Sequence, residues 1–106
     1  MTGNPQDRAP SAEALATRVF RRNPTVSFTR FGEEGLLVVP KASWNMVLNG
    51  AGARAFELID GVRTIGSVAQ AIFEEFDAPS LGEVEADLAE LVADLCGRGA
   101  LEEVLN

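Results

Sequence analysis

Hydrophobic and polar positions alternate in three short segments, at residues 25–31, 36–40 and 44–49. A period of two is typical of a half-buried strand. The intervening GEEG and PKAS contain residues that favour tight turns, so the sequence predicts a three-stranded antiparallel meander. In the third strand, WNMVLN, one set of alternating side chains would face the core: Trp44, Met46 and Leu48.

Apolar residues then recur with helical spacing over residues 50–59, 65–76 and 81–96. Asp-Gly at 60–61 and DAPS at 77–80 separate these helices. We expect another part of the chain to approach the first helix closely, because its first turn contains two glycines. Residues of types that cap helices precede the three segments: Asn49, Thr64 and Ser80, the last forming a capping-box pattern with Glu83.

Three strands followed by three helices predict an α+β fold of the winged helix-turn-helix type, with an N-terminal meander and a three-helix bundle. We expect residues 24–106 to form this domain and residues 1–23 to form a flexible N-terminal extension. Within the extension, residues 1–12 lack periodicity and are expected to be disordered, while SAEALATRVF could form a short helical arm capped by Ser11. ALEEVL at 100–105 could be a final strand or a loose end.

The third helix has a wide apolar arc. A stripe of five residues has the spacing of a core face: Leu81, Val84, Leu88, Leu91 and Leu95. The arc continues through Val92 to Cys96 and covers roughly 140°, although about 100° suffices to bury one face. The surplus could be additional core or the wall of an apolar groove.

The charge distribution disfavours nucleic-acid binding. The chain has 106 residues, which is enough for one domain, and its net charge is −7. Residues 1–23 contain four arginines and two carboxylates, so the remaining residues carry −9. Residues 80–96 contain five carboxylates and no lysine or arginine. A helix with this composition would meet phosphates unfavourably, because nucleic-acid binders neutralise phosphates with basic side chains.

The composition also disfavours catalysis. The chain contains no histidine and one cysteine, which removes the commonest general base and any zinc cluster of Cys and His. Cys96 is expected to be an inert, semi-buried thiol, because neighbouring acidic residues would not lower its pKa. We therefore expect no enzyme activity, no cofactor and no metal. We also expect a cytoplasmic protein, because there is neither a secretory signal nor an apolar run that could span a membrane.

The segment LNGAGARAFELIDGVRTIGSVAQAIFEEFD resembles the PqqD family, named for pyrroloquinoline-quinone biosynthesis, and the wider class of RiPP recognition elements. Four features carry the resemblance, which covers roughly residues 25–104: Leu48-Asn49, Asp60-Gly61, Arg63-Thr64 and the acidic, leucine-rich stretch 84–101. The glycines at 50 and 52 depart from the family pattern, and the N-terminal extension is not explained by it.

The resemblance implies a binding module that captures the leader of a ribosomally made precursor peptide and presents it to a modifying enzyme, often a radical-SAM protein. The leader would pair as an extra strand with the third strand and lie against the third helix. Main-chain pairing of this kind gives affinity with little demand on sequence. The peptide-binding residues expected from position are Trp44, Asn45, Met46, Val47, Val84, Asp87, Leu88, Leu91 and Val92.

The individual roles of these residues stay open at this point. Val47 could contact the leader or be merely exposed, and Trp44 could be a core anchor. Asp87 could clamp a leader Lys, Arg or backbone N–H, or be a solvated surface residue. The sequence does not decide which flank of the third helix faces the groove.

Two other functions are compatible with the same fold. The exposed strand edge could serve a protein-interaction module, including a homodimer formed through that edge. A DNA-binding regulator is the alternative that the charge disfavours. The extension carries Arg18, Arg21 and Arg22, which could dock an acidic partner or belong to a solvated tail.

Overall fold

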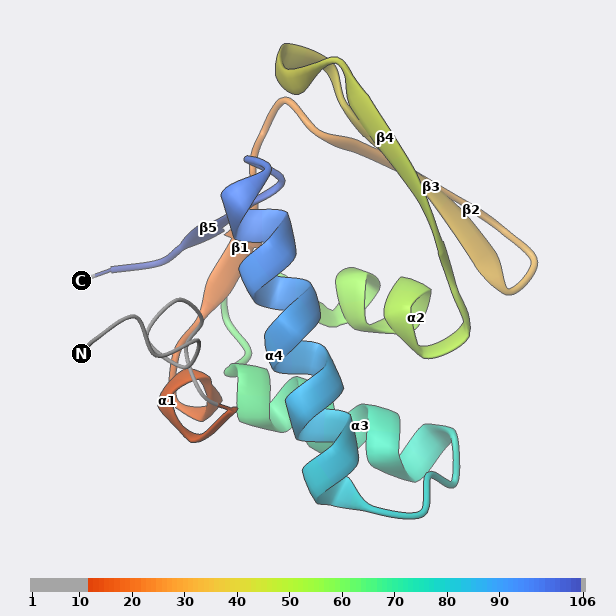
Figure 1. The fold of residues 1–106 in the computed structure, drawn as a ribbon, viewed down its shortest axis with the longest axis vertical. Helices are drawn as coiled ribbons and strands as arrows, with labels where there is room; N and C mark the ends of the chain where they lie inside the picture. Colours follow the sequence, from red (N-terminus) through yellow and green to blue (C-terminus); the bar gives the residue numbers. More distant parts are fainter. Residues whose placement is uncertain (1–11, 106) are drawn as a thin grey trace, which may run out of the picture.

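A computed structural model describes residues 12–105 of the chain (Figure 1). In chain order its elements are α1 (Ala12–Ala16), β1 (Phe20–Arg22), β2 (Ser27–Phe31), β3 (Glu34–Val39), the 3-10 turn η2 (Pro40–Ala42), β4 (Trp44–Asn49), α2 (Gly50–Leu58), α3 (Ile65–Glu75), α4 (Leu81–Gly97) and β5 (Leu101–Glu103). The α+β fold expected from the sequence is confirmed, with β2, β3 and β4 as the meander and α2, α3 and α4 as the three helices.

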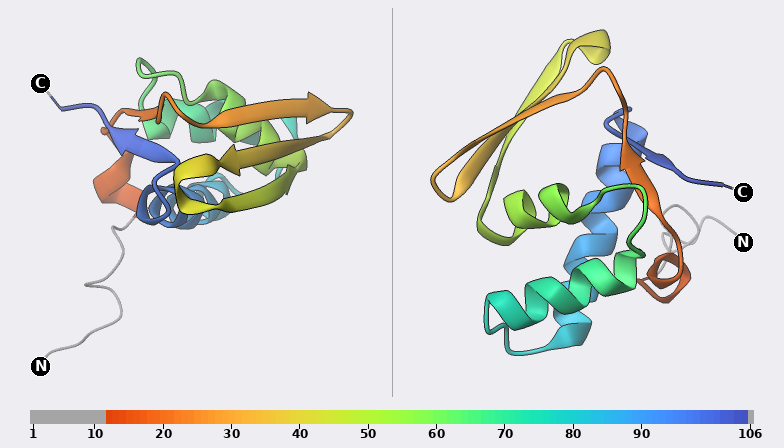
Figure 2. Two further views of the ribbon diagram at one scale, coloured as in Figure 1. Left: turned by 90° about the horizontal axis from the view of Figure 1, so that it is seen from above. Right: turned by 180° about the vertical axis from the view of Figure 1, so that it is seen from behind.

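The meander forms a three-stranded antiparallel sheet in the order β2-β3-β4. Seen from above, β4 is the strand on the side where α4 lies, and β2 is on the opposite side (Figure 2). The predicted core face of β4 is confirmed, because Leu48 is buried and Trp44 and Met46 pack against the core. Val47, which points to the other face, is 54 % exposed.

A second, two-stranded sheet ties the N-terminal part of the chain to the C-terminus. β1 pairs antiparallel with β5, and Leu15 of α1 and Phe20 of β1 are 1 % and 4 % exposed. The predicted boundary at residue 24 is therefore wrong for residues 12–22, because their apolar side chains belong to the core of the same domain. The predicted helical arm is seen as α1. The disorder expected of residues 1–12 concerns residues outside the described range, except for Ala12, which begins α1. The predicted Ser11 cap also lies outside that range.

The helix starts follow the predicted positions but not in every case the predicted chemistry. The Thr64 hydroxyl accepts a hydrogen bond from the Ser67 N–H at 3.2 Å, and the Ser80 hydroxyl accepts one from the Glu83 N–H at 3.3 Å. Asn49 occupies the N-cap of α2 without a side-chain hydrogen bond, so its predicted capping role is wrong.

The structural reason for a glycine directly after Asn49 also differs from the one expected. Gly50 has a φ of 48°, and a Cβ placed on it would meet no atom within 4 Å. The reason for glycine at this position is therefore the left-handed backbone that turns β4 directly into α2, not a close approach of another segment.

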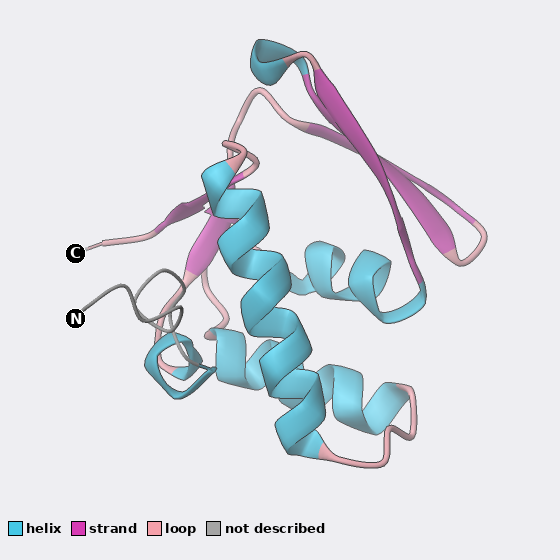
Figure 3. Ribbon diagram, in the orientation of Figure 1, coloured by secondary structure: helices cyan, strands magenta, loops and turns pink. Residues whose placement is uncertain are grey.

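The long helix α4 crosses the front of the molecule, with α2 and α3 behind it and the two-stranded sheet near its C-terminal end (Figure 3). Its buried side chains are Leu88, Ala89, Val92 and Leu95. Three residues of the predicted core stripe are only partly buried: Leu81, Val84 and Leu91. The core face of α4 is therefore rotated from the predicted stripe towards Ala89 and Val92, because α1 also packs against α4.

Candidate functional site

The outer edge of β4 carries backbone groups that no neighbouring strand of the described chain binds. β4 is the last strand of its sheet, and the Gly50 N–H donates to the Glu33 carbonyl at 2.9 Å. Hydrogen-bonded pairs alternate along an antiparallel ladder. The Gly50 bond and the register of β3 against β4 show which residues of β4 bind β3. The backbones of Met46 and Leu48 bind β3, whereas Asn45 and Val47 direct their N–H and C=O groups to the free edge.

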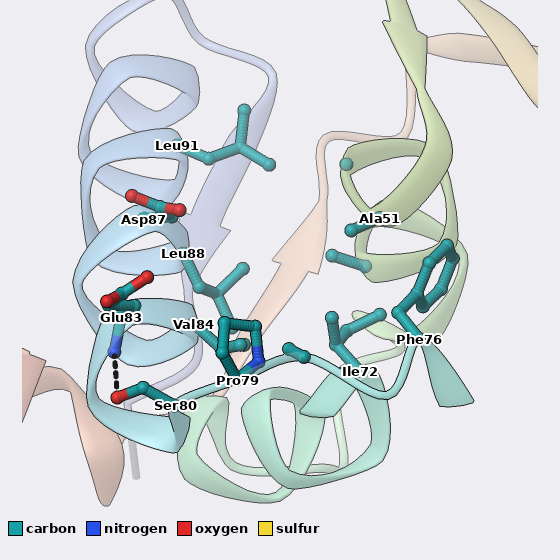
Figure 4. A pocket seen from close by; sticks show the side chains of 13 residues that line it. Ala51, Ile72, Phe76, Pro79, Ser80, Glu83, Val84, Asp87, Leu88 and Leu91 are labelled. Atoms are coloured by element: carbon teal, nitrogen blue, oxygen red, sulfur yellow. Dashed lines mark hydrogen bonds between the residues drawn. The ribbon is translucent and has the colours of Figure 1, made fainter. Parts of the chain in front are cut away.

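An apolar pocket with a volume of about 260 Å³ lies where β4 passes into α2 (Figure 4). It is enclosed by the start of α2, the end of α3, the following loop and the N-terminal half of α4. The wall from α4 consists of Val84, Leu88 and Leu91, and Ile72 and Phe76 stand opposite Val84 in the close view. Phe76 is 44 % exposed, so an aromatic ring stands open to solvent beside the pocket.

The position of two of the pocket walls is held by an ion pair. The Arg54 Nε of α2 donates to Glu75 Oε1 of α3 at 2.9 Å, and Nη2 donates to Oε2 at 3.2 Å. These hydrogen bonds stabilise the charged form of both side chains, so they lower the pKa of Glu75 and raise the pKa of Arg54. A two-pronged contact of this kind fixes orientation as well as distance, so it aligns α2 with the end of α3.

Two carboxylates contribute to the pocket lining. Glu83 and Asp87 lie one turn apart on α4, and in the close view both carboxylates lie on the α4 side of the pocket. Neither takes part in an ion pair among the residues from 12 to 105. Immediately after α4, Arg98 binds Asp94 at 3.0 Å and stacks over the Trp44 ring at 4.4 Å. Thus the C-terminal end of α4 contacts the start of β4 through a cation, and the N-terminal half of α4 presents carboxylates at the pocket that follows the end of β4.

The structure brings most of the expected peptide-binding residues to this side of the molecule. Trp44, Asn45, Met46 and Val47 all lie on β4, and four of the five residues expected from α4 line the pocket: Val84, Asp87, Leu88 and Leu91. The exception is Val92, which is 1 % exposed and lies on the other flank of α4, where it lines a second cavity. The flank of α4 that carries Val84 and Leu91 therefore faces the start of α2 and the end of α3.

Sequence reasoning did not select the residues that complete the pocket. They come from α2, from α3 and from the loop before α4: Ala51, Gly52, Ala55, Ile72, Phe76, Ala78, Pro79, Ser80 and Glu83. The departure of Gly52 from the family pattern was a signal for one of them. A Cβ placed on Gly52 would meet only Leu48, at 3.9 Å, so the missing side chain leaves the α2 side of the pocket open.

The second cavity lies on the opposite flank of α4, between α1, β1 and β5, and has a volume of about 350 Å³. Its lining includes Cys96, whose thiol has a raised pKa because of burial and, to a lesser extent, the charge of Glu103. The expectation that nothing lowers the pKa of Cys96 is confirmed. A reactive thiol requires the opposite shift.

The described part of the chain contains neither a cluster of metal ligands nor a helix that could span a membrane. Between residues 12 and 105, no three side chains of His, Cys, Asp or Glu lie close enough together to ligate a metal ion. Within the same range, no helix combines the length and the hydropathy that crossing a bilayer requires.

Two solved structures have a similar fold. TbiB1, determined in complex with the TbiA(beta) leader peptide, gives a TM-score of 0.71 at 20 % identity, covering 81 % of this chain and 99 % of that one. The PqqD truncation of Methylobacterium extorquens PqqCD, a functional and stand-alone RiPP recognition element solved by NMR in solution, gives a TM-score of 0.67 at 26 % identity. That alignment covers 92 % of this chain and 98 % of that one.

At the level of sequence, the chain matches a known family, whereas no curated protein matches it significantly. The sequence model of the family described as coenzyme PQQ synthesis protein D (PqqD) matches residues 34–101, which run from β3 to the first residue of β5 and include β4, α4 and every residue that lines the pocket. Since this match covers more than half of the chain, the protein belongs to the PqqD family.

Proposed function

We propose that this chain binds the leader segment of a ribosomally made precursor peptide and presents it to a modifying enzyme, without catalysis of its own. The observation that carries the proposal is the free edge of β4 beside the apolar pocket of α4. The edge provides hydrogen-bonding groups for any extended peptide, and the pocket provides a place for a side chain that confers specificity.

The geometry of β4 defines how an added strand would bind. Asn45 and Val47 would exchange backbone hydrogen bonds with the leader. In an antiparallel arrangement, leader residues opposite Trp44, Met46 and Leu48 would point to the inner face of the sheet, because opposite residues share a face. The leader would therefore contact the protein through alternate side chains. The one nearest the end of β4 would enter the pocket, which begins at Ala51.

Both solved relatives support this proposal. The Methylobacterium extorquens PqqD truncation is a functional recognition element, and TbiB1 has the same fold and was determined with a leader peptide. Membership of the PqqD family supports the same role. We propose that the enzyme partner is a radical-SAM protein encoded near this chain, in keeping with the resemblance noted from the sequence.

A titration followed by NMR tests the function. The isotope-labelled full chain would be titrated with a synthetic leader peptide from the short precursor reading frame beside its gene. We expect a Kd in the micromolar range or below. Backbone amide shifts should be concentrated in residues 44–48, 51–55 and 84–91, with the second cavity unaffected.

The opposite results are equally informative. Absence of shifts with that leader would refute leader binding. Shifts around the second cavity alone would move the binding site to the other flank of α4. If the edge of β4 instead shows protein-concentration-dependent shifts without peptide, the strand would be a contact between two copies of the chain.

A further inference from the structure

We propose that the leader bound by this chain carries a Lys or Arg next to the bulky apolar side chain that fills the pocket, and that the carboxylates of Glu83 and Asp87 bind this cation. The inference rests on the proposed leader binding and adds the chemical class of the leader. It follows from the pocket size, from the charges in its lining and from the direction of β4.

The pocket requires a large apolar group. Its volume of about 260 Å³ exceeds the roughly 150 Å³ of a protein cavity that holds one benzene molecule. An aromatic side chain, or a leucine with part of its backbone, matches this space better than a small residue does. Because α4 and α2 supply mostly aliphatic walls, burial there favours Phe, Leu or Trp over any polar side chain.

The charges in the lining favour a cation over an anion. Glu83 and Asp87 stand beside the apolar wall formed by Val84 and Leu91. Among residues 12–105 no ion pair neutralises them, and the arginines of this range have partners elsewhere: carboxylates for six of them and the Phe56 carbonyl for Arg22. A leader carboxylate at this point would be repelled, whereas a Lys or Arg would be attracted.

A cation at the C-terminal end of the same helix lies at the other end of β4. Arg98 lies over Trp44, where β4 begins, whereas the pocket lies beside Ala51, just after β4 ends. A leader antiparallel to β4 enters at the pocket and leaves at Trp44. The basic residue and the apolar anchor should therefore lie in the N-terminal part of the bound segment, and the segment near Arg98 should tolerate acidic residues.

A phage-displayed library of random 12-residue peptides, selected on the immobilised full chain, tests this specificity without a known leader. We expect enrichment of Lys or Arg within two positions of a Phe, Leu or Trp. The variant Glu83→Lys/Asp87→Lys should select Asp or Glu at that place. The matched control is Glu13→Lys/Glu74→Lys, which has the same net charge but alters exposed residues outside the pocket, and it should keep the basic preference.

The most enriched peptide would then be synthesised with its basic residue and with Glu in its place. We expect about fivefold to tenfold weaker binding of the Glu peptide to the natural chain, since an exposed ion pair contributes up to about fivefold and reversal adds repulsion. The milder variant Asp87→Asn should reduce this difference, and circular dichroism would verify its folding.

Three results would overturn the inference. One is selection of apolar residues without a basic preference, and another is an unchanged basic preference in the pocket variant. Both leave leader binding intact, because the NMR titration decides that separately. Selection of no peptide at all would also refute the proposed preference for a basic residue, and a negative titration would then refute leader binding as well.

Discussion

Replacement of Val47 by proline should weaken leader binding while leaving the fold nearly unchanged. The ladder between β3 and β4 places the Val47 N–H at the free edge, where no strand of the described chain accepts it. Proline lacks this donor, and it is tolerated in edge strands whose N–H side faces solvent. The neighbouring variant Met46→Pro provides the contrast, because the Met46 N–H lies on the side of β3.

The expected magnitudes differ clearly between the two variants. Val47→Pro removes one hydrogen bond to the leader, worth about 0.5–1.5 kcal/mol, which corresponds to about twofold to tenfold in Kd. Its unfolding free energy should change little, since no bond within the protein is lost. Met46→Pro removes a bond to Leu37, which is 0 % exposed, and leaves a buried carbonyl unpaired. Together these effects should cost about 2–4 kcal/mol of stability.

Urea unfolding gives the stabilities, and fluorescence polarisation with the labelled leader gives the affinities. Val47→Ala is the matched control for the side chain, which is exposed. If Val47→Pro binds the leader as tightly as Val47→Ala, the edge is not the binding strand. If it unfolds as readily as Met46→Pro, the phase of the ladder deduced from the Gly50 bond is incorrect.

Substitutions at Gly52, Leu15 and Asp60 test other parts of the structure. Gly52→Ala should raise the unfolding free energy by about 0.5–1 kcal/mol, because alanine is the better helix former and its Cβ meets only Leu48 at 3.9 Å. Gly52→Leu should fill the pocket and weaken leader binding, and equal affinity for both variants would contradict the position of the anchor. Leu15→Ala should cost about 2–5 kcal/mol in urea unfolding, as its side chain is in the core, whereas Glu13→Ala should cost little. A Leu15 variant as stable as the natural chain would show that α1 is not part of the domain. The pKa of Asp60 is lowered by hydrogen bonds from the Arg63 and Val62 N–H groups. The contribution of the Asp60 carboxylate to the free energy of unfolding is therefore complete above the ordinary carboxyl pKa of about 4, and it is lost as the pH falls through the lowered pKa. The stability difference from Asp60→Asn should accordingly shrink in strong acid, and a constant difference between about pH 6 and about pH 2 would contradict this origin.

The sequence by itself determined the order and type of the main elements. Alternation over residues 44–49 predicted both β4 and its inward face, because in a strand one residue in two is buried. Thr64 and Ser80 predicted the starts of α3 and α4, since their hydroxyls satisfy N–H groups that a helix leaves free. The motifs around Leu48-Asn49 and Asp60-Gly61 were sufficient to indicate the PqqD family, which the family match confirmed.

Only the tertiary structure decided which face of α4 is buried. The periodicity of α4 is compatible with several rotations, because leucines and valines cover more than one face. Packing of α1 against α4 buries Val92 and leaves Val84 and Leu91 for the pocket. The role of α1 and β1 was itself hidden, because a strand of three residues has too short a pattern to be read without its partner β5. The pocket joins residues from 51 to 91, and such a combination of distant positions exists only when the helices are packed together.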